Sequence, residues 1–259
     1  MKKILSDFLF FIYKQAFACL FGAFILLLII GCRYYYPLEG SIYQYDFLFI
    51  AVVVFQLFLV LSKYESYQEV GIIMIFHFVA MIMEIFKTHP SIGSWSYPGD
   101  FFIGIYGVPL FAGFMYSAVG SYITRVWKIF EFRYSQYPKK IYTVMIALAI
   151  YINFFTHHFI FDVRYIIIIA ILATFGRTKI YFKPNKKYYS MNLAFGFSLV
   201  ALFIWFAENI ATYMRIWIYP SQSQVWHMVG IEKITAWFLL MIISFVLVSF
   251  LHKPKTFNK

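Results

Sequence analysis

Eight runs of mostly apolar residues constrain this chain more than any other feature of its sequence. They occupy 15–32, 46–62, 70–88, 101–124, 140–156, 159–176, 193–213 and 234–251. A helix needs about 20 such residues to cross a membrane, and a helix satisfies its own backbone hydrogen bonds within lipid. The fifth and sixth runs are short and are joined by a tight turn. The runs therefore predict an all-α, polytopic membrane bundle of about eight transmembrane helices.

The composition supports a chain that is surrounded by lipid. Charged residues make up 13% of the chain and apolar residues 63%, whereas soluble domains carry about 25% charged residues. The net charge is +11, but the cations lie in the connections between apolar runs, which favours an anionic membrane surface over nucleic acid. We therefore expect membrane lipids as partners, and no nucleic acid. The two cysteines, Cys19 and Cys32, form no CxxC pair, so we expect neither a disulfide framework nor a thiolate metal site.

Lysine and arginine are distributed unevenly over alternate connections. Of the 22 basic residues, 17 fall on the side that holds both termini. The other side receives Arg33, Lys87, Arg164, Arg215 and Lys233. Short connections rich in Lys and Arg stay in the cytoplasm. We therefore expect both termini in the cytoplasm, with the first run retained as an uncleaved span, and the connections rich in His, Trp and Pro facing outward.

Two similar motifs end the third and seventh runs. The first is Glu84-x-x-x-Thr88 followed by Trp95-x-Tyr97-Pro98, and the second is Glu208-x-x-x-Thr212 followed by Trp217-x-Tyr219-Pro220. The match predicts a single membrane domain, 1–259, built as a parallel repeat of four-helix halves near 1–135 and 136–259. Functional sites of such repeats lie at the interface between the halves. The alternative for the Trp and Tyr residues is the ordinary aromatic belt of membrane proteins.

The glutamates of these motifs need a further explanation. Each lies about one turn inside the outer boundary of its run, where ionisable residues normally face the protein interior and mark functional sites. Two facing carboxyl groups could act as a general acid and a general base, or could couple transport to protons. A glutamate that only accepts a hydrogen bond from Thr or Trp is the structural alternative. We predict catalytic roles for Glu84, Glu208, His158 and Asp162. The predicted substrate-binding residues are Trp95, Tyr97, Trp217, Tyr219, Asn209 and His77.

Histidines of the outer connections are candidate metal ligands. The predicted set is His89, His157, His158 and Asp162, which would suit zinc or iron if the connections converge. The chain contains no HxxxH and no HExxH motif. The sequence therefore leaves open whether the cofactor is zinc, iron or none.

Four segments carry a resemblance to a known family. They are FKTHPSIGSWSYP, GVPLFAGFMYSAVGSY, NFFTHHFIFDVRY and ALFIWFAENIATYMRIWIYP. With them the chain resembles, over nearly its whole length, the bacterial membrane family called domain of unknown function 817. This resemblance implies an integral protein of the bacterial cytoplasmic (inner) membrane whose activity is not established.

A looser resemblance concerns chemistry. Glu84, Trp95, Tyr97, Val108 and Pro109 are similar to a pattern in membrane carotenoid hydratases and lycopene cyclases. Those enzymes are duplicated helical bundles that protonate isoprenoid double bonds, so the resemblance implies an isoprenoid-like substrate. The second motif lacks the glycine and the Val-Pro of that pattern.

These observations favour an intramembrane enzyme that acts on an apolar isoprenoid or lipid by carboxylate acid–base chemistry near the outer face. The first alternative is a small-solute or proton-coupled transporter, and the second is a metal-dependent membrane hydrolase. A transporter would place its polar residues near the middle of the bilayer, whereas these residues lie near the outer boundary.

Overall fold

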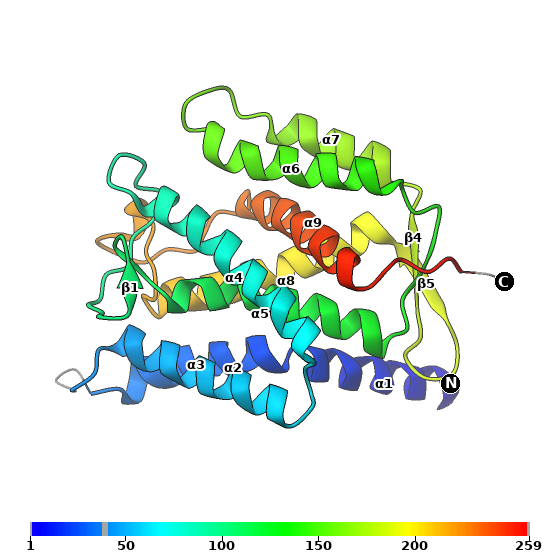
Figure 1. Cartoon of the computed structure of the whole chain (residues 1–259), viewed down its shortest axis with the longest axis horizontal. Helices are drawn as coiled ribbons and strands as arrows, with labels where there is room; N and C mark the ends of the chain where they lie inside the picture. Colours follow the sequence, from blue (N-terminus) through cyan, green and yellow to red (C-terminus); the bar gives the residue numbers. More distant parts are fainter. Residues whose placement is uncertain (1, 38–40, 258–259) are drawn as a thin grey trace. The chain divides into compact units, whose positions relative to one another are not determined.

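The computed structural model describes residues 2–37 and 41–257, and most of them are helical (Figure 1). The helices are α1 (Lys2–Ala18), α2 (Leu20–Tyr35), α3 (Gln44–Leu61), α4 (Tyr67–Thr88), α5 (Phe111–Ile129), α6 (Lys140–Thr156), α7 (Arg164–Phe175), α8 (Leu193–Tyr213), η1 (Pro220–Gln222) and α9 (Lys233–Leu251). The strands are β1 (Gly104–Ile105), β2 (Val108–Pro109), β3 (Arg133–Ser135), β4 (Lys179–Phe182) and β5 (Tyr189–Asn192). The prediction of a helical protein is confirmed, but the strands make the all-α description incomplete.

Among the described residues, α3, α4, α8 and α9 are long and apolar enough to cross a membrane. The pair α1–α2, interrupted at Cys19, adds a fifth candidate if it is counted as one bent span. The apolar helices α6 and α7 are shorter. The 12 residues of α7 rise about 18 Å, less than the ~30 Å of a hydrocarbon layer. The fold is that of a helical membrane protein, and the count of eight spans stays a prediction.

The start of the predicted run 101–124 is not helical. The strands β1 and β2 form a hairpin there, and α5 begins only at Phe111. Gly107, with φ +79°, supplies the left-handed conformation that the tight turn requires. The buried Asp46 carboxylate on α3 accepts hydrogen bonds from the backbone N–H groups of Phe102 at 2.9 Å and Ile103 at 2.8 Å. These bonds satisfy backbone groups that a helix would otherwise pair.

The chain divides into two compact units, each built from separate segments. Unit 1 comprises 1–20, 120–203 and 234–259, and unit 2 comprises 21–119 and 204–233. This division differs from the predicted halves 1–135 and 136–259, and the repeat of whole halves stays a prediction.

Unit 2 has a core contributed by α2, α3, the start of α5 and the end of α8. Phe21, Leu48, Phe111 and Ala211 are buried there. A second cluster joins Met81 of α4 to Val108 of β2 and to α5. Figure 1 shows the connections that follow α4 and α8 at the same end of this unit. The connection after α4 and the connection after α8 therefore lie at the same end of this core, although they are far apart in the sequence.

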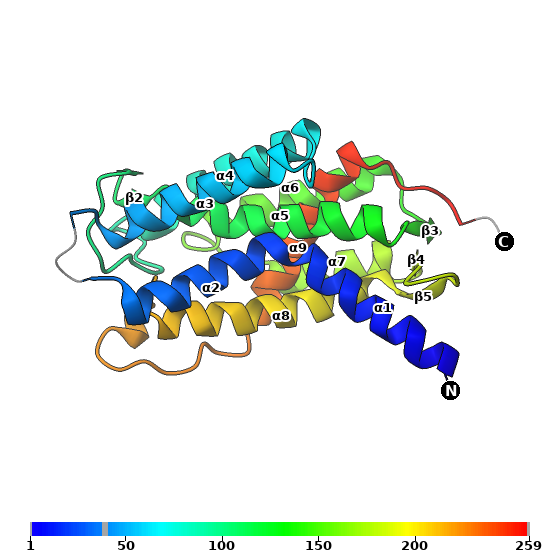
Figure 2. The same cartoon turned by 90° about the horizontal axis from the view of Figure 1, so that it is seen from below.

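Unit 1 contains an antiparallel pair, α6 and α7, and the three-stranded sheet in the order β3–β4–β5. Figure 2 shows the sheet near the N-terminal half of α1. The Tyr189 hydroxyl of β5 donates to Asp7 of α1 at 2.7 Å, and the Lys14 ammonium donates to the Lys183 carbonyl at 2.8 Å. These bonds attach α1 to the β4–β5 hairpin.

Candidate functional site

Glu84 is the centre of a buried hydrogen-bond cluster in unit 2. It lies one turn before the end of α4 and is 1% exposed. One carboxylate oxygen accepts hydrogen bonds from the Trp95 indole at 2.8 Å and from the Tyr97 hydroxyl at 2.6 Å. The other oxygen accepts from the Tyr116 hydroxyl at 2.7 Å. A carboxylate has about four acceptor positions, so the three aromatic donors orient this group firmly.

Glu208 has a related environment near the end of α8. Its side chain is 3% exposed and accepts a hydrogen bond from the Tyr219 hydroxyl at 2.6 Å. The Tyr219 ring in turn lies 4.3 Å from the Lys233 ammonium. Trp217 packs against the core of unit 2. Each glutamate therefore binds a Tyr from the connection that follows its own helix.

The two connections pair with each other through their central residues. The Ser96 N–H donates to the Ile218 carbonyl at 3.0 Å, and the Ile218 N–H donates back to the Ser96 carbonyl at 2.9 Å. Ser96 separates Trp95 from Tyr97, and Ile218 separates Trp217 from Tyr219. The antiparallel bridge is thus centred on both Trp-x-Tyr motifs, as a local two-fold relation between them requires.

Aromatic contacts complete the link between the glutamates. The rings of Trp95 and Tyr219 meet edge to face, with their centroids 6.3 Å apart. Since Trp95 donates to Glu84 and Tyr219 donates to Glu208, both carboxyl groups belong to one cluster. We name this set of Glu84, Trp95, Tyr97, Tyr116, Glu208 and Tyr219 the glutamate cluster.

The hydroxyl groups of Tyr97 and Tyr219, the two cluster tyrosines in the connections, resist ionisation. Burial, and then the negative charge of Glu84, raise the pKa of Tyr97 well above its usual range. Burial, followed by the charge of Glu208 and a smaller effect of Glu84, likewise raises the pKa of Tyr219 well above its usual range. Both hydroxyls therefore stay protonated and act as hydrogen-bond donors at neutral pH.

Local backbone features bring the first connection back over α4. The Ser94 N–H donates to the Lys87 carbonyl at the end of α4, at 2.8 Å. Gly93, with φ +57°, adopts the left-handed conformation that this reversal needs. From α3, the Tyr45 hydroxyl donates to the Ile216 carbonyl at 2.5 Å, while its ring lies edge-on to Tyr97. Tyr45 thus contacts both connections.

Asn209, predicted to bind substrate, anchors the second connection. Its side-chain amide donates to the Trp205 carbonyl, and its side-chain oxygen accepts from the Val229 N–H, both at 2.8 Å. The Trp205 indole also donates to the Val229 carbonyl, at 3.1 Å. Asn209 therefore stabilises the second connection against α8. Its contact with a substrate stays a prediction.

His77 lies two turns before Glu84 on α4. Its ring packs on Phe114, with centroids 4.7 Å apart, and a side chain at Gly113 would clash with it. Within 2–37 and 41–257, no hydrogen-bond partner is found for its buried Nδ1 atom. His77 therefore occupies the space between α4 and α5 that Gly113 leaves.

The predicted residues of the α6–α7 connection belong to unit 1. Asp162 accepts hydrogen bonds from the Asn153 amide at 3.1 Å and from the Arg164 guanidinium at 2.6 Å. The rings of His157 and His158 lie 4.0 Å apart. Residues 157–163 are not helical, so the four-residue spacing of His158 and Asp162 does not make them neighbours on a helix. Their catalytic roles stay predictions.

The predicted metal ligands are spread over both units. His89, at the end of α4, contacts the Ser91 hydroxyl at 2.8 Å, while the other three residues of the set lie in unit 1. In the described part of the chain, no group of three or more His, Cys, Asp or Glu side chains is arranged to hold a metal ion. A zinc or iron site stays a prediction.

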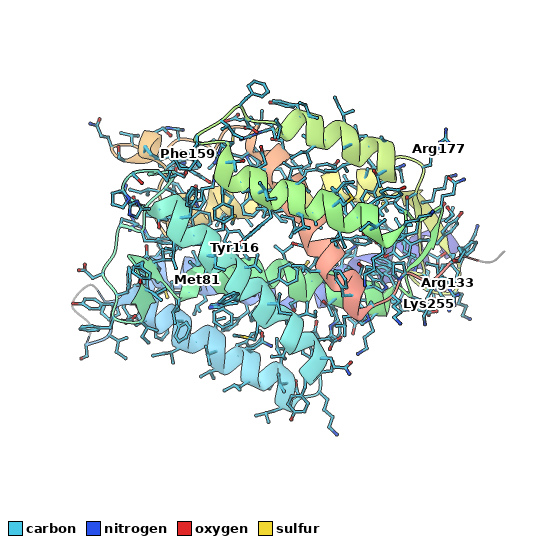
Figure 3. The ribbon with its side chains drawn as sticks, turned by 45° about the horizontal axis from the view of Figure 1, so that its top comes forward. Met81, Tyr116, Arg133, Phe159, Arg177 and Lys255 are labelled. Atoms are coloured by element: carbon cyan, nitrogen blue, oxygen red, sulfur yellow. The ribbon has the colours of Figure 1, made fainter. Side chains whose placement is uncertain are left out.

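Tyr116 is the member of the glutamate cluster that the sequence analysis missed. It lies on α5, 32 residues after Glu84, inside a mostly apolar segment. Figure 3 labels it together with Met81 of the neighbouring helix α4. A tyrosine within an apolar segment was the available signal, because its hydroxyl needs a partner when it is buried.

The fold and this cluster define a class of helical membrane protein with two buried glutamates held by Trp and Tyr side chains. The model of the family described as "Protein of unknown function (DUF817)" matches residues 7–245, and the chain belongs to this family. It is 39% identical over 243 residues to the "Uncharacterized protein YoaT" of Bacillus subtilis (strain 168), which covers 94% of this chain and 90% of that protein. No solved structure matches the chain.

Proposed function

We propose that the chain is an intramembrane enzyme that acts on an apolar isoprenoid or lipid through the carboxyl groups of Glu84 and Glu208. The observation that supports this proposal is the joining of two buried carboxyl groups, from α4 and α8, in one cluster of aromatic donors. Burying two such groups in one cluster is costly, and membrane proteins retain ionisable residues at these depths mainly for function.

The proposed chemistry needs only proton transfer. One carboxylic acid of the pair gives its proton to a carbon of a double bond, and a carbocation forms on the neighbouring carbon. The other carboxylate then removes a proton from an adjacent carbon, so the net reaction is an isomerisation of the double bond. If a second double bond of the substrate attacks the cation before the proton is removed, the net reaction is a cyclisation. The aromatic rings of Trp95 and Tyr97 beside Glu84 are suited to stabilising the cation. No oxidant or reductant is required.

The position of the cluster along its helices favours an enzyme over a transporter. Glu84 lies four residues before the end of α4, and Glu208 five before the end of α8. A transporter would be expected to bind its solute near the middle of its spans, at helices that are broken there. Both glutamates lie near the ends of their helices, which favours the enzyme.

The proposal includes an orientation in the membrane. We place the chain in the bacterial cytoplasmic membrane with about eight spanning segments, both termini in the cytoplasm and the glutamate cluster near the outer face. The distribution of Lys and Arg supports this orientation. Reporter fusions after Lys63, Arg133 and Lys187 should then report a cytoplasmic location, and fusions after Ser94 and Ser223 an outer one.

The test compares the lipids that co-purify with the protein and with its Glu84→Gln/Glu208→Gln variant. Mass spectrometry should find an isoprenoid or lipid whose amount or structure changes in the variant, because substrate accumulates when proton transfer stops. Elemental analysis of the same samples reports any zinc or iron. The matched control is Glu69→Gln, a buried glutamate at the other end of α4 that caps its first turn, where Gln can replace Glu.

The outcomes separate the alternatives. A lipid difference confined to the double variant would support the enzyme. Identical lipids in all three proteins, with solute-driven proton uptake in vesicles for the wild type and Glu69→Gln but not for the double variant, would replace the enzyme with a transporter. Stoichiometric metal lost in the variant would point to a metal-dependent hydrolase instead.

A further inference from the structure

The three-stranded sheet of unit 1 has one apolar face and one basic face. Residues that oppose each other in the register share a face, so Arg133 and Tyr181 lie on one side, as do Ser135 and Lys179. The intervening pair, Tyr134 and Ile180, lies on the other side and is buried. The Tyr134 ring packs there on Trp127 at 5.2 Å and on Phe245 at 5.9 Å. The apolar face is therefore covered by the core of unit 1.

The other side of the sheet gathers positive charge. Its exposed cations, with those of the adjoining segments, are Arg177, Lys179, Lys186, Lys187, Lys253 and Lys255. We call this set, with Arg133, the basic face. Figure 3 shows Arg133, Arg177 and Lys255 toward one end of unit 1. Among the described residues of this unit, Glu131 is the exposed acid, and it is already paired with Lys183 at 3.1 Å.

Aromatic rings alternate with these cations. The C-terminal segment adds to the sheet, because the Tyr134 N–H donates to the Lys255 carbonyl at 2.8 Å and the Phe257 N–H donates to the Tyr134 carbonyl at 2.9 Å. The Phe257 ring stacks on Tyr181 at 3.9 Å. The Arg133 guanidinium donates to the Tyr188 hydroxyl at 3.2 Å. Amphipathic rings beside cations are typical of the headgroup level of a membrane.

Helix α1 provides an apolar surface beside the basic face. Its side chains Phe8, Leu9 and Tyr13 are exposed, while Asp7 and Lys14 attach the helix to the β4–β5 hairpin. An exposed apolar face next to a concentration of Lys and Arg is the arrangement of proteins that lie in the interface of an anionic membrane. Binding of a soluble anion would require the cations of the basic face but not the exposed apolar surface of α1.

We propose that the basic face binds the phosphate groups of anionic phospholipids, such as phosphatidylglycerol, in the cytoplasmic leaflet. The lysines act as point charges toward several headgroups, and Arg133 and Arg177 offer paired N–H donors to phosphate oxygens. This proposal does not depend on the function of the glutamate cluster, which belongs to unit 2.

The experiment measures phospholipid binding to the full-length protein in detergent by native mass spectrometry. Phosphatidylglycerol and phosphatidylcholine are titrated at low salt against wild type and Lys179→Gln/Lys187→Gln. Each cation near an anionic surface contributes on the order of fivefold in affinity, so the variant should bind phosphatidylglycerol about twenty-five-fold more weakly. Binding of phosphatidylcholine should be weak and unchanged, and added salt should reduce the difference.

The control variant Arg33→Gln removes an exposed cation of unit 2 that the proposed orientation places at the outer face, and it should bind phosphatidylglycerol like the wild type. If the first variant melts at a lower temperature, Lys186→Gln alone, in the β4–β5 turn, should still weaken binding about fivefold. Equal binding of phosphatidylglycerol by all variants would overturn the proposal. So would equal binding of the two lipids, or complete displacement of phosphatidylglycerol by millimolar inorganic phosphate, which would indicate a site for a soluble anion.

Discussion

The rings of Trp95 and Tyr219 meet edge to face, with 6.3 Å between their centroids, and each side chain donates its hydrogen bond to a different glutamate. The contact joins residues from two connections that are separated by more than a hundred positions in the sequence. It makes Glu84 and Glu208 parts of one cluster.

Neutralising the two glutamates should have non-additive effects on stability. Both glutamates belong to one hydrogen-bonded aromatic cluster, so the effects of Glu84→Gln and Glu208→Gln should depend on each other. The stability change of the double variant should differ from the sum of the two single changes by about 0.5–3 kcal/mol. Unfolding in a mixed-detergent titration at neutral pH measures this coupling. Glu84→Gln combined with Glu69→Gln, 15 residues apart on α4, should instead be additive within about 0.5 kcal/mol.

Removing one hydrogen-bond donor from Glu84 should lower the free energy of unfolding more than removing an exposed hydroxyl does. Tyr116→Phe leaves a buried carboxylate oxygen without its donor at 2.7 Å, so we expect a loss of about 1–3 kcal/mol in the free energy of unfolding. Tyr213→Phe, at an exposed position on the same end of α8 as Glu208, should change it by less than about 0.5 kcal/mol. Equal effects of the two substitutions would contradict the hydrogen bond.

The pairing of the two connections predicts a specific crosslink. Ser96 and Ile218 exchange both of their backbone hydrogen bonds, and Cα atoms of such a pair lie about 5.5 Å apart, within the range of a disulfide. In a chain whose Cys19 and Cys32 are replaced by Ser, Ser96→Cys/Ile218→Cys should oxidise readily, as detected by peptide mass spectrometry. Ser94→Cys/Ile218→Cys, two residues out of register, should not, and a crosslink in both pairs would argue for a mobile connection.

Alkaline pH should destabilise the fold through Tyr97 and Tyr219. Because the pKa of each is raised in the folded protein, the contribution of these hydroxyls is fully present below about pH 10. It is lost as the pH rises from there toward the folded pKa, at about 1.4 kcal/mol per pH unit for each group. Between pH 8 and 11, the free energy of unfolding should fall less steeply with rising pH for Tyr97→Phe/Tyr219→Phe than for the wild type. A slope equal to that of the wild type would contradict the burial of these hydroxyls.

Local sequence patterns predicted the position of several helices and the helix ends at which the glutamates lie. The apolar runs predicted α3, α4, α8 and α9 closely, because spanning length and hydropathy are properties of a contiguous segment. The motifs around Glu84 and Glu208 identified the glutamates and the connections that cover them. The same patterns predicted a helix from residue 101, where the hydrogen bonds from Phe102 and Ile103 to Asp46 favour a hairpin instead.

The sequence by itself determined that this chain is helical, rich in apolar runs and marked by two glutamates next to Trp-x-Tyr motifs. Only the tertiary structure decided that Tyr116 is the third donor to Glu84, that Ser96 pairs with Ile218, and that three short strands form a sheet with one basic face. The physical reason is that hydropathy acts over neighbouring residues, whereas each of these features satisfies a polar group with a partner distant in the chain. Such partners become evident only when the packed helices have placed them together.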